Sequence, residues 1–170
     1  MKQTKPMIAV HVQNAAGYDG LPGPEDFQHW VELALQGYPR KAEICIRIVD
    51  PAESAQLNRQ YRHKGSPTNV LSFPADLPDF VQDPSLGDLV LCAEVVAREA
   101  GGQDKPIREH WAHLVIHGCL HLLGFDHEHD REARIMEKQE TLLLARCGIG
   151  DPYHVDGGTN EFISNKTGDL

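Results

Sequence analysis

The sequence has few cysteines and no long apolar run, and each shortage excludes a class of protein. The four cysteines lie far apart and form no CxxC pair, so we expect neither a disulfide framework nor a thiolate zinc site. No apolar stretch approaches the roughly 18 residues of a membrane helix, and residues 1–14 lack the apolar core of a secretory signal. We therefore expect a soluble, cytoplasmic protein with no membrane association.

Basic residues are also in short supply. Sixteen lysines and arginines stand against 25 acidic residues, and the net charge of −9 argues against a surface that binds polyanions in general. The charge is uneven, because residues 40–64 hold six basic and three acidic side chains whereas residues 76–88 hold four aspartates and no base. A local anion site is therefore compatible with an acidic protein, although most of these charges are expected on a solvated surface.

Periodicity and end signals predict four strands and five helices. Ile44, Ile46 and Ile48 alternate with other residues as in a half-buried strand. The expected strands span residues 7–12, 44–48, 70–73 and 89–92, with residues 75–86 as a loop. The expected helices run from Pro24 toward Gly37, from Asp50 to about Tyr61, and over residues 94–100, 106–123 and 130–146, where Gly101 and Gly102 break the third.

This order of elements predicts an α+β fold with a mixed sheet of about four strands and about five helices. The length of 170 residues suits one domain, and neither a repeat nor a linker divides the chain. We assign residues 1–153 to a single domain. Residues 154–170 are polar and rich in glycine, and we expect them to form a flexible C-terminal tail.

Histidine is the abundant residue type, and six of the ten histidines fall between His110 and His129. On a helix, His117 and His121 lie four residues apart on one face, so both can reach one ion. Gly124 stands where a helix ends in a left-handed residue, and the chain can then turn His127 back toward the same ion. Three neutral imidazoles with an open fourth position are the ligand set of a catalytic zinc site.

The remaining histidines fit this site less well. His113 and His121 are eight residues apart, about 12 Å along a helix, which is too far for both to bind one ion comfortably. We therefore expect His110 and His113 to support the ligands or pack in the core, with His129 as the substitute for His127. A closed, structural zinc site is the alternative, but Cys119 faces away from the helical histidines and supplies no fourth ligand.

The spacing of the histidines matches the HExxHxxGxxH pattern of metzincin proteases except at one position. In that pattern the glutamate after the first histidine is the general base, whereas this chain has Gly118. Asp126 and Glu128 are the nearby carboxylates that could replace it. Asp126 could instead orient a ligand histidine through its second ring nitrogen or bond to the backbone of the turn.

Residues 117–127, HGCLHLLGFDH, resemble the HGxLHLxGxDH signature of the YbeY family of bacterial metal-dependent endoribonucleases. The resemblance extends to LNRQYR at residues 57–62, PTNVLSFP at residues 67–74 and LGDLV at residues 86–90. It covers roughly residues 40–153, and the combination of segments is far more specific than HxxxH alone.

The resemblance implies a zinc-dependent hydrolase of single-stranded RNA within residues 1–153. It implies action in ribosomal RNA maturation, especially at the 3′ end of the small-subunit RNA, and in ribosome quality control. His117, His121 and His127 would hold one divalent metal, expected to be zinc, and Arg62 would assist catalysis or bind RNA. A guanidinium suits this role because its planar, permanent charge matches phosphate oxygens; Arg59 is a second candidate.

Two other functions remain open from the sequence. The same three histidines could serve a metzincin-like hydrolase of peptide or amide bonds with a different base, or the chain could be a non-enzymatic ribosome-associated assembly factor. Because an acidic chain has little general affinity for RNA, we also expect the ribosome, its small subunit or a ribosome-associated protein partner to present the RNA.

Overall fold

Four strands form one mixed sheet in the computed structural model, which describes residues 7–78, 80–126 and 128–153. The strands are β1 (Ile8–Asn14), β2 (Ala42–Val49), β3 (Val70–Pro74) and β4 (Ser85–Cys92), in the order β1-β2-β4-β3. The pairs β1–β2 and β2–β4 are parallel, and β3 runs antiparallel to β4 at the edge. The expected mixed sheet of four strands is confirmed.

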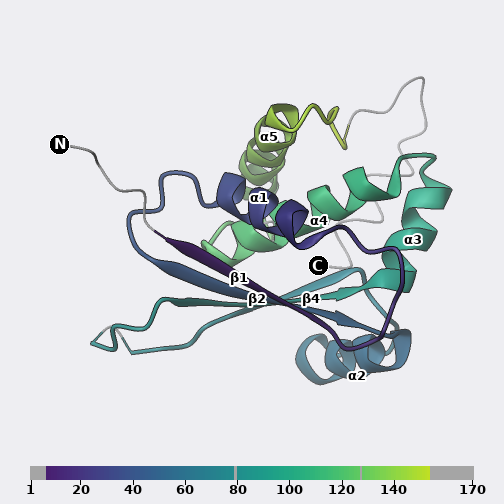
Figure 1. Cartoon of the computed structure of the whole chain (residues 1–170), viewed down its shortest axis with the longest axis horizontal. Coiled ribbons are helices and arrows are strands. Elements are labelled where there is room, and N and C mark those ends of the chain that lie inside the picture. The colour runs from purple at the N-terminus through teal and green to yellow at the C-terminus, as the bar shows by residue number, and fades with distance from the viewer. Residues whose placement is uncertain (1–6, 79, 127, 154–170) are drawn as a thin grey trace.

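Helices cover both faces of this sheet, as Figure 1 shows. The described part of the chain contains α1 (Pro24–Ala34), α2 (Pro51–Arg62), α3 (Ala93–Gly102), α4 (Ile107–Leu122) and α5 (Asp130–Arg146). Helices α1, α4 and α5 lie on one side of the sheet and α2 lies on the other. The predicted α+β class is therefore confirmed. None of the described helices is both long enough and apolar enough to cross a membrane.

Helix α4 is the central helix of the larger layer, and twelve of its sixteen residues are buried. Trp111, Ile116 and Leu120 are among its fully buried side chains, and Trp111 packs edge-on against Phe27 of α1 with ring centroids 5.9 Å apart. A helix that is apolar around most of its circumference has to be enclosed on several sides. His110, His113 and His117 of α4 are consequently held in the interior of the molecule.

Gly118 brings α4 unusually close to the sheet. A Cβ atom at this position would lie 2.7 Å from Leu89 Cδ2 and 3.3 Å from Ser72 Oγ. Ser72 uses the close approach, because its hydroxyl donates a hydrogen bond of 3.2 Å to the Gly118 carbonyl. The glycine fixes the distance of the histidine-bearing helix from β3 and β4.

Two expected boundaries were wrong. Strand β4 begins at Ser85, four residues before the expected start, and includes the end of the expected loop. A bulge opposite Glu43 and Ile44 accommodates this extension, and Gly87 adopts the positive φ of 139° that a side chain would disfavour. The α3 helix also continues through the two glycines expected to break it, with Gln103 N bonded to Glu99 O at 2.9 Å.

Candidate metal centre

Four histidines form a row along α4. His110, His113, His117 and His121 follow one another at intervals of three or four residues, and neighbouring rings lie 4.6–6.1 Å apart between centroids. His110, His113 and His117 are buried, whereas His121 is partly exposed. The row therefore runs from the interior to the surface at the C-terminal end of the helix.

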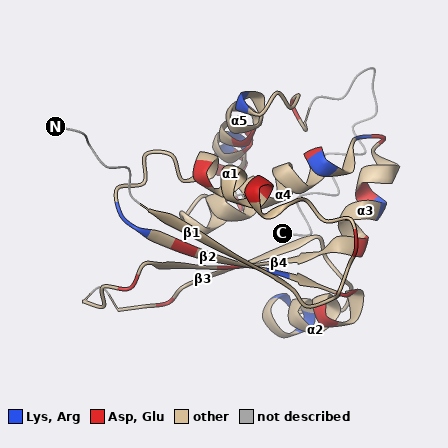
Figure 2. Ribbon diagram, in the orientation of Figure 1, with Lys and Arg blue, Asp and Glu red and all other residues tan. Residues whose placement is uncertain are grey.

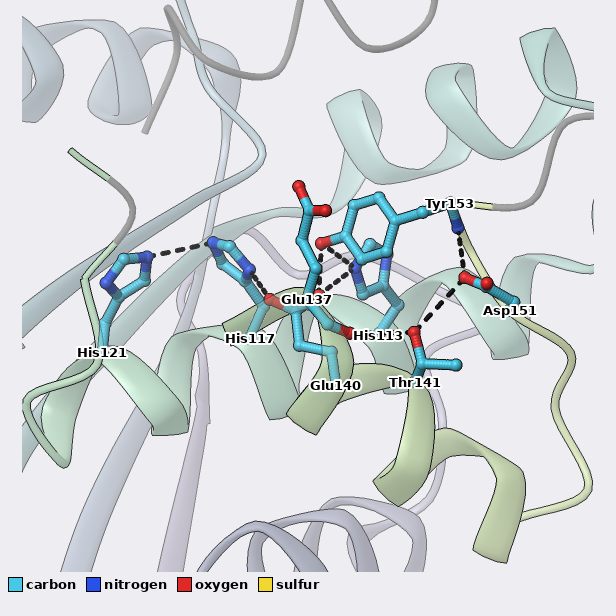
Figure 3. Close-up of polar contacts among 8 residues, drawn as sticks. All are labelled: His113, His117, His121, Glu137, Glu140, Thr141, Asp151 and Tyr153. Carbon is cyan, nitrogen blue, oxygen red and sulfur yellow. Dashed lines mark hydrogen bonds and ion pairs between the residues drawn. The ribbon is translucent and has the colours of Figure 1, made fainter. Parts of the chain in front are cut away.

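His117 and His121 point toward each other at the exposed end of the row (Figure 3). Their Nε2 atoms are 3.1 Å apart. The Nδ1 atom of His121 faces the Phe125 carbonyl oxygen at 3.0 Å, and Nδ1 of His117 bonds to Oε1 of Glu140. Because both partners are acceptors, each Nδ1 carries the proton it donates, and in this tautomer each Nε2 directs its lone pair at the other ring.

Two lone pairs at this separation repel each other unless a cation lies beside them. A tetrahedral zinc ion with bonds of about 2.0–2.1 Å holds its ligand nitrogens about 3.3 Å apart, close to the observed spacing. The protons on Nδ1 are placed as ligand histidines require, since the second ring nitrogen of a ligand histidine normally donates to a carboxylate or carbonyl. The pair therefore fits a divalent metal.

The turn after α4 has the geometry that the sequence predicts. Gly124 has φ of 98°, and its N–H bonds to the His121 carbonyl at 3.0 Å while Phe125 N bonds to the Leu120 carbonyl at 3.0 Å. These two bonds form a Schellman motif, which reverses the chain after the helix. His127, the third expected ligand, lies outside the described residues.

Glu140 of α5 sits at the buried side of the histidine pair, and its side chain is 0% exposed. Its Oε1 accepts from His117 Nδ1, and Oε2 contacts His113 Nε2 at 2.8 Å. Burial opposes ionisation of this carboxyl, but the imidazoles of His117 and His113 outweigh burial and hold the pKa of Glu140 well below its usual range. Both oxygens of this ionised carboxylate are thus in contact with ring nitrogens in the core.

Tyr153 completes this buried network from beyond α5. Its hydroxyl donates to Oε2 of Glu140 and lies 3.3 Å from His113 Nε2. Burial, reinforced by the nearby Glu140 carboxylate, raises the pKa of the Tyr153 phenol far above its usual range, so the phenol stays a donor. Its backbone is tied to α5 through Asp151, whose Oδ1 accepts from Tyr153 N at 2.8 Å and lies 3.3 Å from Thr141 Oγ1.

His113, His117 and Glu140 could themselves hold a metal ion. Each offers one ligand atom, and the three atoms lie within 4.8 Å of one another. Cysteine adds nothing to either arrangement, because burial raises the pKa of the Cys119 thiol to about 12 and keeps it protonated. The four cysteines are free, and the sequence predicts no disulfide framework.

Arg62 and Asp126 are two further residues that the sequence singles out. Arg62 is the last residue of α2, on the face of the sheet opposite α4 (Figure 1), and burial lowers the pKa of its guanidinium. The loop after it is anchored by Asn58, whose Nδ2 donates to the Ser66 carbonyl at 2.8 Å. Asp126 accepts from Glu128 N at 3.2 Å, which is the backbone role the sequence left open.

Sequence reasoning missed Glu140 and Tyr153. A signal for Glu140 was present, because Met136, Leu143 and Leu144 are buried at intervals that place Glu140 in the same stripe of α5. A lone carboxylate within an apolar stripe is rarely left without a partner. Tyr153 has no comparable signal, since it follows the last helix in a polar segment.

Comparison with known proteins decides the family. The family model described as Endoribonuclease YbeY matches residues 21–148. The chain belongs to the YbeY family. It is 53% identical over 151 residues to the endoribonuclease YbeY of Pseudomonas fluorescens, an alignment that covers 88% of this chain and 99% of that protein.

The YbeY fold is also found in a solved structure. The solution structure of TM1509 from Thermotoga maritima matches with a TM-score of 0.54 and 23% identity, over 90% of this chain and 99% of that one. At this identity the match concerns the fold alone. The resemblance drawn from HGCLHLLGFDH and the three upstream segments is confirmed at the level of the family.

Proposed function

We propose that this chain is a metal-dependent endoribonuclease that cleaves single-stranded RNA, with His117, His121 and His127 as the metal ligands. The observation that carries the ligand assignment is the 3.1 Å approach of the two Nε2 atoms, whose rings each keep their Nδ1 proton on an acceptor. The relative named endoribonuclease YbeY supports the reaction class.

The pair of His117 and His121 is a better metal site than the buried trio. In the trio, both oxygens of Glu140 already accept hydrogen bonds from ring nitrogens or from Tyr153. The trio is also fully enclosed, whereas the partly exposed His121 leaves the pair accessible to a substrate. A catalytic metal needs an open coordination position, which favours the pair.

A divalent cation held there supplies Lewis acidity toward a phosphoryl oxygen and favours ionisation of water near neutral pH. The family resemblance gives Arg62 the part of binding the phosphate, whose negative charge grows as the phosphodiester bond breaks, although Arg62 ends α2 on the other face of the sheet from α4. A guanidinium remains charged even where burial lowers its pKa, so half-buried Arg62 keeps its cation. The protein's other contribution is to hold His117 and His121 in one orientation.

Gly118 is the reason to prefer RNA cleavage over metzincin-like peptide hydrolysis. The metzincin base would stand at this position, but a Cβ there would lie 2.7 Å from the fully buried Leu89. Any side chain at residue 118 would therefore point into the packed sheet, away from solvent. A glutamate could not act there without displacing the contact between α4 and β4.

Zinc is the metal we propose, because imidazole nitrogens in a tetrahedral arrangement suit it. The RNA we propose is ribosomal RNA, with the 3′ end of the small-subunit RNA as the region cleaved. Figure 2 shows acidic and basic residues interspersed on α2, α3 and α5. Such a surface binds RNA weakly in general, so we propose that the ribosome or a ribosome-associated protein presents the substrate in the cytoplasm.

The test combines metal analysis with RNA cleavage. Elemental analysis of the purified protein is expected to give about one zinc per chain. A labelled single-stranded RNA spanning the 3′ end of small-subunit ribosomal RNA is then incubated with the wild type, His121→Ala and Arg62→Ala. Arg98→Ala, at an exposed position of α3, is the matched control, and a duplex of the same sequence tests strand specificity.

We expect His121→Ala to lose both zinc and cleavage, and Arg62→Ala to keep zinc but cleave at least about a hundredfold more slowly. Arg98→Ala should behave as the wild type. Equal cleavage by all proteins would contradict the proposal and indicate a contaminating nuclease. Suppose that His121→Ala loses zinc but the wild type cleaves neither the isolated RNA nor the RNA in small subunits. That result would favour the non-enzymatic assembly factor.

A further inference from the structure

Glu140 connects the metal pair to the interior through a chain of hydrogen bonds. It reaches α4 from α5, 23 residues away from His117 in sequence. Its two oxygens are divided between two tasks, because Oε1 contacts His117 while Oε2 contacts His113 and Tyr153. Figure 3 shows His113, Glu140 and Tyr153 grouped on one side of His117, with His121 on the other.

We propose that Glu140 is the positioning residue of the metal site. Its carboxylate keeps the proton of His117 on Nδ1 and fixes the rotation of the ring, so that the Nε2 lone pair points at the ion shared with His121. This inference rests on the proposed function, in which His117 and His121 hold the metal. Glu140 itself does not bind the ion.

The geometry supports this role because His117 has one ring nitrogen for each partner. Nδ1 is bonded to Glu140 Oε1 and Nε2 faces His121 Nε2 at 3.1 Å. A flipped ring would lose both contacts and would leave Oε1 of the carboxylate, which is 0% exposed, without its donor from His117. Leaving a buried acceptor oxygen unsatisfied is unfavourable, so the carboxylate selects one ring orientation before any metal arrives.

His113 and Tyr153 hold Glu140 in place for this task. His113 Nε2 lies 2.8 Å from Oε2, and the Tyr153 hydroxyl donates to the same oxygen. Asp151 ties this tyrosine to α5, since its Oδ1 bonds to Tyr153 N at 2.8 Å and lies 3.3 Å from Thr141 Oγ1. With Oε2 anchored, the glutamate presents Oε1 to His117 in a single position.

A second pair of a buried histidine and a glutamate serves as a control for this arrangement. His110, three residues before His113 on α4, contacts Glu99 Oε1 of α3 through Nε2 at 2.9 Å. This is the same pairing of a buried imidazole with a glutamate, and Asn69 supports the carboxylate at 3.1 Å. Loss of the Glu99 charge should disturb a buried histidine on the same helix without touching the metal pair.

The experiment measures zinc affinity by competition with a chromophoric chelator. The proteins are the wild type, Glu140→Gln, Glu99→Gln and His121→Ala, each checked for folding by circular dichroism. Glu140→Gln should weaken zinc binding about 10- to 100-fold, the usual effect of losing an outer partner of a ligand histidine. Glu99→Gln should bind zinc as the wild type does, and His121→Ala should lose binding.

Nitrogen NMR of the metal-free proteins provides a second readout that does not depend on activity. His117 should be protonated on Nδ1 in the wild type and in Glu99→Gln, and should show a mixture of tautomers in Glu140→Gln. If Glu140→Gln does not fold, Tyr153→Phe removes one anchor only. That variant should weaken zinc binding about two- to tenfold, the effect of one hydrogen bond.

Two results would overturn the inference, and they differ in what else they overturn. In the first, His121→Ala loses zinc while folded Glu140→Gln binds zinc as the wild type does. If Glu140→Gln does not fold, wild-type zinc binding by Tyr153→Phe has the same meaning. The positioning role is then wrong and the proposed ligands stand. If His121→Ala keeps zinc while Glu140→Gln loses it completely, Glu140 is a direct ligand with His113 and His117. Both the inference and the proposed ligand set would then be wrong.

Discussion

Individual charged residues in this protein differ greatly in how much their surroundings constrain them. Glu140 is fully enclosed and has a ring nitrogen or hydroxyl on each oxygen. Asp26 of α1 is a contrasting case, because it pairs with Arg108 of α4 at 2.6 Å while the side chains remain 29% and 58% exposed. Arg108 also lies over the Trp30 ring, 5.4 Å from its centroid. The exposed pair adds little stability, whereas Glu140 fixes a ring.

Replacement of Asp26 by asparagine should therefore have a small, pH-dependent effect. The hydrogen bond from Arg108 outweighs burial and lowers the pKa of Asp26. A lowered pKa in the folded protein stabilises it above the unfolded pKa of about 3.9, and this contribution is lost as the pH falls through the folded value. Urea unfolding of Asp26→Asn should show a loss of about 0.2–1 kcal/mol at pH 7.

The difference between Asp26→Asn and the wild type should disappear once the pH falls below the lowered pKa of the folded Asp26, where the aspartate is protonated in both states. Glu25→Gln, in the same turn of α1 and exposed, is the control and should have no comparable effect. A loss that persists unchanged at low pH would show that packing around Asp26, rather than its ion pair, is responsible.

At the scale of elements, the contact between α4 and the sheet positions the histidines. Gly118 follows His117 directly and precedes His121 by three residues, and Ser72 bonds to its carbonyl at 3.2 Å. A change in helix-to-sheet distance would therefore move His117 relative to α5 and Glu140. Gly118 stands where the metzincin pattern has its glutamate base, and the same residue allows α4 to approach the sheet closely.

Gly118→Ala should destabilise the protein by about 1–3 kcal/mol, because the added methyl overlaps Leu89 Cδ2 at 2.7 Å in a fully packed region. The matched control is Gly101→Ala in α3, where nothing lies within 4 Å of the added atom. That variant should be neutral or more stable by about 0.4–1 kcal/mol. Denaturant unfolding of both proteins checks the difference. Equal stability of the two variants would mean that α4 shifts freely on the sheet.

Across the whole molecule, acidic character and interspersed charge limit its electrostatic attraction to RNA. The net charge is −9, and Figure 2 shows acidic and basic residues mixed on α2, α3 and α5. Affinity for single strands falls with salt in proportion to the number of phosphates neutralised. A site built around one metal and Arg62 should contact few phosphates.

Cleavage of single-stranded RNA should consequently depend only weakly on salt. A plot of log kcat/KM against log salt concentration should have a slope between about −0.7 and −2, which corresponds to one to three phosphate contacts. The measurement uses the zinc-loaded wild type at constant pH. A slope steeper than about −4 would reveal an extended cationic surface, and the expected need for a ribosome or partner to present the RNA would lose its basis.

The sequence by itself determined the order of elements and most of the local geometry of the site. Asp50 was predicted to start a helix, and its Oδ1 accepts from Glu53 N at 2.8 Å. Gly124 was predicted to end α4 in the left-handed region, and it does. These features follow from partners within a few residues, so local pattern is sufficient to predict them. The same holds for the family, whose motifs are short contiguous segments.

Only the tertiary structure decided what surrounds the histidines and how far the sheet extends. His113 meets Glu140 and Tyr153 across 27 and 40 residues of sequence, and no local pattern specifies which elements will be adjacent in the core. The early start of β4 likewise depends on pairing with β2 around a bulge. The ligand spacing is local to one helix and its turn, whereas ring orientation depends on a carboxylate brought by another helix.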